Sequence, residues 1–102
     1  TISAVKKYIN EHVDEKITLN QLSDVFNISP NYLSILFSKY NDMGFIDYVN
    51  HAKIECAKEM LDEGTLKIYE ISDKLGYESA FYFSRVFKTV EGVSPRDYIN
   101  RT

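Results

Sequence analysis

The side chains best suited to chemistry in this sequence lie in two segments that contain no acidic residue. The first runs from Val25 to Asn41 and the second from Ser79 to Val90, in a chain with 15 Asp and Glu against 12 Lys and Arg. The second segment contains SAFYFSRVFK, with four aromatic side chains and two cations. Cations and hydroxyl groups without carboxylates suit the binding of a polyanion, since an acid would be repelled by phosphates.

Catalytic and metal-binding chemistry has little support. His12 and His51 lie far apart, and neither has a second His or Cys at metal-ligand spacing. The sequence has no nucleophile motif and no Gly-rich phosphate loop. Asp47 and Asp97 are interpreted as first-turn helix acids that the helix dipole stabilises. We therefore expect neither an enzyme nor a metal protein, and no cofactor.

The composition predicts a small folded protein. The 102 residues are 44% apolar and 14% aromatic, and no run approaches the ~18 apolar residues of a membrane span. The single Cys56 excludes an intramolecular disulfide and fits a reducing cytoplasm, where we expect the protein to work. Because the sequence opens on Thr1, we expect it to be a fragment of a longer chain.

Almost every segment has the periodicity of an amphipathic helix, so the predicted fold is all-α. Thr18-Leu-Asn-Gln21 is a capping-box pattern, Asn27 tolerates a left-handed turn, and Ser29-Pro30 supplies an N-cap and a first-turn proline. The longest helix is expected from Gly44 to about Leu61, stopping near Gly64. Its apolar face is predicted to carry Phe45, Val49, Ala52, Cys56 and Met60.

The second half of the chain repeats the first. Residues 19–24 match 68–73, and residues 29–37 match 79–87 after one inserted residue, Glu78. Residues 47–49 then match 97–99, and Asn27 corresponds to Gly76, both suited to a left-handed turn. This pattern indicates an internal duplication of one supersecondary unit.

The repeated unit has the layout of a helix-turn-helix, whose second helix enters the DNA major groove. The side chains expected to be buried from these second helices are Tyr32, Leu33, Leu36, Phe37 and Tyr82, Phe83, Val86, Phe87. The side chains left for other contacts are Pro30, Asn31, Ser34, Ile35, Ser38, Lys39 and Ala80, Phe81, Ser84, Arg85, Lys88. A central helix of roughly 27 Å could hold both in successive major grooves, about 34 Å apart.

The second unit resembles the signature of the AraC/XylS family of bacterial transcription regulators. The residues that carry the resemblance are Gly76-Tyr77, Tyr82 to Lys88, Gly92-Val-Ser-Pro95 and Tyr98. The resemblance implies seven helices, with a first unit at 1–43, a central linker helix at 44–63 and a second unit at 64–102. Within the family, 17–22 and 67–72 are most similar to output domains of YesN-like two-component response regulators.

The resemblance also implies which residues contact DNA. The family's base-reading positions fall on Asn31, Ser34, Ile35, Ala80, Phe81 and Arg85. Two residues depart from the family pattern. Ile35 stands where Arg is frequent; it cannot donate to guanine but can contact a thymine methyl. Lys53 stands where the central helix commonly carries Arg. Arg85 is the strongest candidate for a guanine contact. The residues expected to contact phosphates are Thr18, Ser38, Lys39, Lys67, Ser84, Lys88 and Arg96.

The partners implied are double-stranded promoter DNA, RNA polymerase and an upstream receiver domain. A small-molecule sensor domain upstream is the alternative. The net charge of −3 keeps open a different class, a helical protein-interaction module that does not bind DNA.

Overall fold

The computed structural model describes residues 2–40 and 43–101, and the regular structure within these ranges is helical throughout. The helices are α1 (Ile2–Glu11), α2 (Leu19–Phe26), α3 (Pro30–Lys39), α4 (Phe45–Glu63), α5 (Ile68–Lys74), α6 (Ala80–Glu91) and α7 (Pro95–Ile99). The predicted all-α fold with seven helices is therefore confirmed. None of the helices in these ranges combines the length and the hydropathy that a bilayer span requires.

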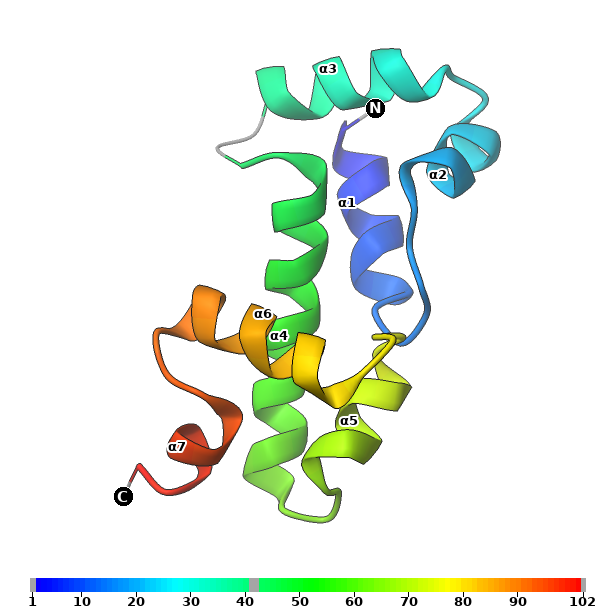
Figure 1. The fold of residues 1–102 in the computed structure, drawn as a ribbon. Helices are drawn as coiled ribbons and strands as arrows, with labels where there is room; N and C mark the ends of the chain where they lie inside the picture. The colour runs from blue at the N-terminus through cyan, green and yellow to red at the C-terminus, as the bar shows by residue number, and fades with distance from the viewer. Residues whose placement is uncertain (1, 41–42, 102) are drawn as a thin grey trace.

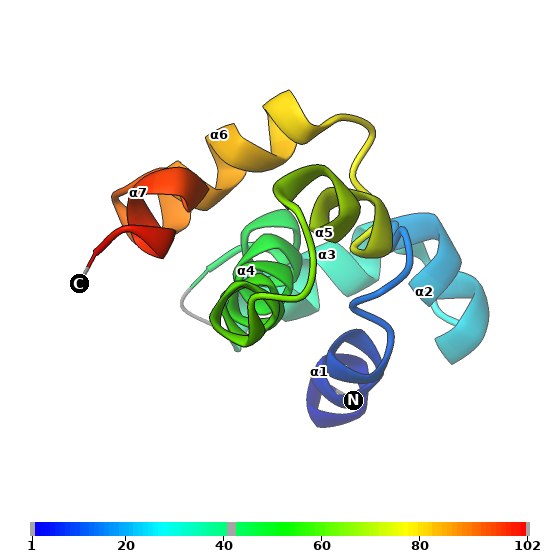
Figure 2. The same ribbon diagram turned by 90° about the horizontal axis from the view of Figure 1, so that it is seen from below.

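Helix α4 runs through the length of the molecule and contacts both halves (Figure 1). Helices α1 and α3 pack on its first half, and α2 packs on α3. Helices α5, α6 and α7 pack around its second half, and α6 crosses it. Viewed from the end in Figure 2, α6 and α1 lie on opposite sides of α4. The result is two helix-turn-helix units arranged along one shared helix.

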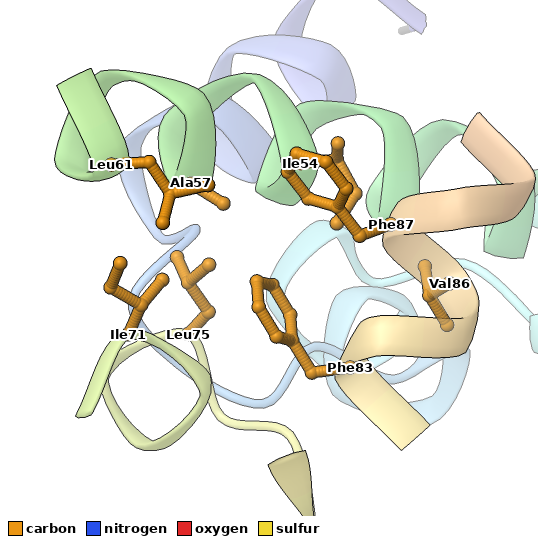
Figure 3. Close-up of a cluster of buried hydrophobic side chains, with 8 residues drawn as sticks. All are labelled: Ile54, Ala57, Leu61, Ile71, Leu75, Phe83, Val86 and Phe87. Atoms are coloured by element: carbon orange, nitrogen blue, oxygen red, sulfur yellow. The ribbon is translucent and has the colours of Figure 1, made fainter. Parts of the chain in front are cut away.

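Each unit has its own hydrophobic core. The first core consists of Val5, Ile9, Leu22, Leu33, Phe37, Phe45 and Val49. The second consists of Ile54, Ala57, Leu61, Ile71, Leu75, Phe83, Val86 and Phe87 (Figure 3). Helix α4 contributes to both cores, so that it connects them without a break in the backbone.

The predicted core face of α4 is wrong in its second half. Phe45 and Val49 are buried as expected, but Ala52, Cys56 and Met60 are only partly buried. The buried positions continue instead at four-residue spacing through Lys53, Ala57 and Leu61, joined by Ile54. Because this series contains a lysine, apolar periodicity alone favours the neighbouring positions Ala52, Cys56 and Met60.

Lys53 is buried between the two units, with a relative exposure of 4%. Its Nζ atom donates to the backbone carbonyls of Val13 (2.7 Å), Glu15 (2.5 Å) and Leu75 (2.5 Å). Burial lowers the pKa of Lys53 to about 8, against the opposing effect of the Asp14 carboxylate, so the ammonium form still predominates at pH 7. An ammonium has three N–H donors, and here each has an acceptor.

Gly76 brings the turn of the second unit against the loop of the first. Its φ is +80°, and a Cβ atom there would lie 2.9 Å from the Lys16 nitrogen and 3.1 Å from the Glu15 carbonyl carbon. The next residue, Tyr77, donates its hydroxyl hydrogen to Asn50 Oδ1 of α4 at 3.0 Å, and burial raises the pKa of this hydroxyl. Gly76 is therefore required both for its conformation and for close approach.

Gly76→Ala is expected to lower the free energy of unfolding by more than Gly64→Ala. A methyl group at Gly64 (φ +73°) meets no atom within 4 Å, so it costs only the strained φ, about 1–2 kcal/mol. Overlap with backbone atoms at Gly76 raises the cost to about 2–5 kcal/mol. Urea unfolding followed by circular dichroism measures both. Equal losses at the two positions would contradict the close packing of Gly76 on Glu15 and Lys16.

Candidate nucleic-acid interface

Helix α3 turns one face to the first core and leaves the opposite face open. It begins after Ser29, whose Oγ accepts a hydrogen bond from the Tyr32 backbone nitrogen at 3.1 Å, and Pro30 is its first residue. The left-handed turn before it is confirmed at Asn27 (φ 54°). Of its side chains, Leu33 and Phe37 are buried. The predicted contact residues on its other face are exposed or half-buried: Asn31, Ser34, Ile35, Ser38 and Lys39.

Helix α6 repeats this arrangement in the second unit. Ser79 Oγ accepts from the Tyr82 backbone nitrogen at 3.0 Å, as the duplication predicts. Phe83, Val86 and Phe87 are buried. The predicted contact residues are again exposed or half-buried: Ala80, Phe81, Ser84, Arg85 and Lys88. The relative exposure of Phe81, 75%, excludes a core position.

The prediction that Tyr32 and Tyr82 are core residues is wrong. Their relative exposures are 54% and 49%. Both lie one residue before the buried aromatic or aliphatic stripe, at its edge, where a tyrosine packs part of its ring and keeps its hydroxyl in water. The Tyr82 ring lies 6.0 Å from that of Tyr77. Leu36 is half-buried.

Arg85 is an exposed cation with an aromatic neighbour. Its guanidinium carbon lies 6.0 Å from the centroid of Phe81, one helical turn earlier, within range of a cation–π interaction. It forms no ion pair with any carboxylate in the described part of the chain. It also lines an open hollow of about 570 Å³ between α4 and α6, with Asn50, His51 and Thr89 among the other lining residues.

Six of the predicted contact residues line two hollows that the duplication relates to each other. The first, of about 440 Å³, lies between the starts of α2 and α4 and is lined by Thr18, Ser34 and Ser38. The second, of about 540 Å³, lies between the starts of α5 and α7 and is lined by Ala80, Ser84 and Arg96. Serine and threonine hydroxyl groups therefore line both hollows, and Arg96 adds a cation to the second one.

The hollows also contain two exposed residues that sequence reasoning missed. Ile46, 70% exposed, lines the first hollow, and Tyr69, 58% exposed, lines the second. Ile46 is the duplication partner of Arg96, fifty residues later. Extending the repeat alignment one residue before Asp47 and Asp97 would have found Ile46 as a surface position.

Some Lys and Arg side chains in the described part of the chain form ion pairs, and others do not. Lys16 forms an ion pair with Glu78, Lys58 with both Glu55 and Glu91, and Arg101 with Asp62. By contrast, the cations predicted to contact DNA have no acidic partner among the described residues: Lys39, Lys67, Arg85, Lys88 and Arg96. These five side chains therefore remain available for an anionic partner, although the Asp47 carboxylate lines the hollow beside Ser34 and Ser38.

Comparison with known proteins gives consistent matches along the chain. A family model described as a helix-turn-helix domain matches residues 22–101. The uncharacterized HTH-type transcriptional regulator YijO of Escherichia coli (strain K12) is 38% identical over 95 residues, which cover 93% of this chain and 34% of that protein. The chain thus spans about a third of the length of this relative.

Two solved structures share the whole fold. The C-terminal domain of AraT, a response regulator from Geobacillus stearothermophilus, has a TM-score of 0.93 and 32% identity, covering 99% of this chain and 84% of that one. The C-terminal domain of the two-component response regulator yesN from Fusobacterium nucleatum subsp. nucleatum has a TM-score of 0.88 and 34% identity, covering 95% of each chain.

Proposed function

The chain belongs to the AraC/XylS-type helix-turn-helix family of transcriptional regulators, and from this premise we propose that it binds promoter DNA through α3 and α6 in successive major grooves. The observation that carries the proposal is that α3 and α6, which lie at different levels along α4 (Figure 1), expose equivalent faces. Cations without an acidic partner among the described residues lie on or near both helices. The molecule is 43 Å long, with α3 near one end and α6 crossing α4 further along it (Figure 1). Successive major grooves on one face of DNA lie about 34 Å apart.

In this proposal each exposed side chain has a role that follows from its chemistry. Arg85 donates two hydrogen bonds to a guanine, and Asn31 pairs with an adenine edge. Ser34 hydrogen-bonds to a base, while Ile35, Ala80 and Phe81 make apolar contacts. The hydroxyl groups and cations around them contact phosphates and fix the register: Thr18, Ser38, Lys39, Lys67, Ser84, Lys88 and Arg96.

The wider context of the chain is also part of the proposal. The likeness to C-terminal domains of two response regulators, at 32% and 34% identity, supports an output domain controlled by a receiver domain upstream. A small-molecule sensor upstream is the alternative. RNA polymerase at the promoter, within the bacterial cytoplasm, is the proposed protein partner. Residues 1–43, 44–63 and 64–102 serve as first unit, linker helix and second unit.

The affinity for duplex DNA is expected to fall steeply with added salt. If Lys39, Lys67, Lys88 and Arg96 each neutralise a phosphate, log Kd changes with log salt concentration with a slope of about 3 to 4. Fluorescence anisotropy on a duplex chosen by random selection measures it. Lys88→Ala is expected to lower the slope by about 1.

The matched control for Lys88→Ala is Lys7→Ala. Lys7 is an exposed lysine on α1, which lies across α4 from α6 (Figure 2), so its removal is expected to leave the slope unchanged. Absence of any salt-dependent affinity for duplex DNA would defeat the proposal and favour a helical protein-interaction module.

Arg85→Ala is expected to weaken binding to the selected duplex by ~1–3 kcal/mol and to relax the preference at one base pair. Arg85→Lys keeps the charge but loses the two-pronged guanidinium, so it should restore little of that preference. Binding of duplexes with each base pair substituted in turn checks both variants. If Arg85→Lys retained the full preference, Arg85 would be only a source of positive charge.

A further inference from the structure

At one pair of equivalent positions, the two open faces carry one hydrogen-bonding and one apolar side chain each, in opposite order. Asn31 is equivalent to Phe81, and Ile35 is equivalent to Arg85, fifty residues apart in both cases. Along α3 the polar residue comes first and the apolar one follows a turn later. Along α6 the apolar residue comes first and the cation follows. Residues four apart on a helix share a face, so each pair is presented together.

The apolar member of each pair takes no part in the core. Ile35 is 57% exposed and Phe81 is 75% exposed, on the faces opposite Phe37 and Phe87. Ile46, 70% exposed, lines the hollow that Ser34 and Ser38 also line, and so adds apolar surface beside α3. A surface built to bind only phosphates would have no use for these side chains.

Among the four base pairs, the major-groove group that suits an apolar side chain is the C5-methyl of thymine. We propose, on the basis of the DNA-binding function above, that each half-site contains a thymine recognised through this methyl, by Ile35 in one and by Phe81 in the other. Asn31 and Arg85 select the accompanying adenine and guanine. The contact between the Phe81 ring and the Arg85 guanidinium, 6.0 Å apart, puts thymine and guanine next to each other in the second half-site.

Deoxyuridine tests this proposal because it pairs as thymine does and lacks only the methyl group. In the selected duplex each thymine is replaced in turn by deoxyuridine, and Kd is measured by fluorescence anisotropy at fixed salt. At the thymine facing Ile35 or Phe81, the loss of one buried methyl is expected to raise Kd about four-fold. Replacement at other thymines leaves Kd unchanged.

Variants assign each methyl to a side chain. Ile35→Ala is expected to abolish discrimination at one thymine only, and Phe81→Ala at one thymine in the other half-site. Because both side chains are exposed, neither variant should lower the thermal midpoint, which circular dichroism checks. Ile99→Ala removes a similarly exposed side chain (47%) at the end of α7 and should leave every thymine-to-deoxyuridine ratio unchanged.

Three outcomes would overturn the inference. Equal affinity of the unaltered chain for every deoxyuridine duplex, with steep salt dependence intact, would remove thymine-methyl recognition and leave DNA binding in place. If both alanine variants kept the full four-fold effect, other residues would recognise the thymine methyl groups. Failure to bind any duplex would remove the inference together with the proposed function.

Discussion

The Lys53 ammonium, buried between the two helix-turn-helix units, is the point at which these units are fixed to each other. Its three donors are taken by carbonyls from the loop after α1 and from the end of α5. Removing an ammonium from water is costly, and only acceptors for all of its donors offset that cost. The group therefore favours one relative placement of the two segments, since any sliding would leave a donor or a carbonyl unpaired.

Two further contacts act at the same place. Gly76 lets the second unit's turn lie directly on Glu15 and Lys16, and Tyr77 is hydrogen-bonded to Asn50 of α4. Each unit has a separate core, so α4 alone would connect them only as a rod that can twist or bend at its middle. The contacts of Lys53, Gly76 and Tyr77 fix the rotation of one unit about the rod. The open faces of α3 and α6 thereby acquire a set distance and orientation.

Much of this arrangement could be predicted from the sequence because it depends on local rules. The capping box at Thr18, the serine caps and the left-handed turns at Asn27 and Gly76 are properties of short segments, and all are confirmed. The duplication then identified equivalent faces on α3 and α6. Exposure of Arg85 and Asn31 followed from placing the apolar residues inward. Which of these residues touch bases stays a prediction.

The remaining features depend on contacts between distant segments, which periodicity does not report. Lys53 interrupts the buried stripe of α4 because its partners are carbonyls 38 and 40 residues earlier and 22 later. The sequence indicated that Gly76 forms a turn, but it did not indicate that this turn lies against Glu15 and Lys16. Tyr32 and Tyr82 were assigned to the core because a tyrosine at the edge of a stripe has the same spacing as one within it.

The central claim is that the contacts of Lys53, Gly76 and Tyr77 hold α3 and α6 as one rigid unit, which the proposed function requires to bind two half-sites together. The most direct measurement compares the affinity for a selected duplex with that for the same duplex carrying five extra base pairs between its half-sites. Five base pairs turn one half-site by about half a helical turn, to the opposite side of the DNA. A rigid reader then binds no more tightly than it binds a duplex with one half-site. Unchanged affinity would contradict the account, because it would require two units that move independently.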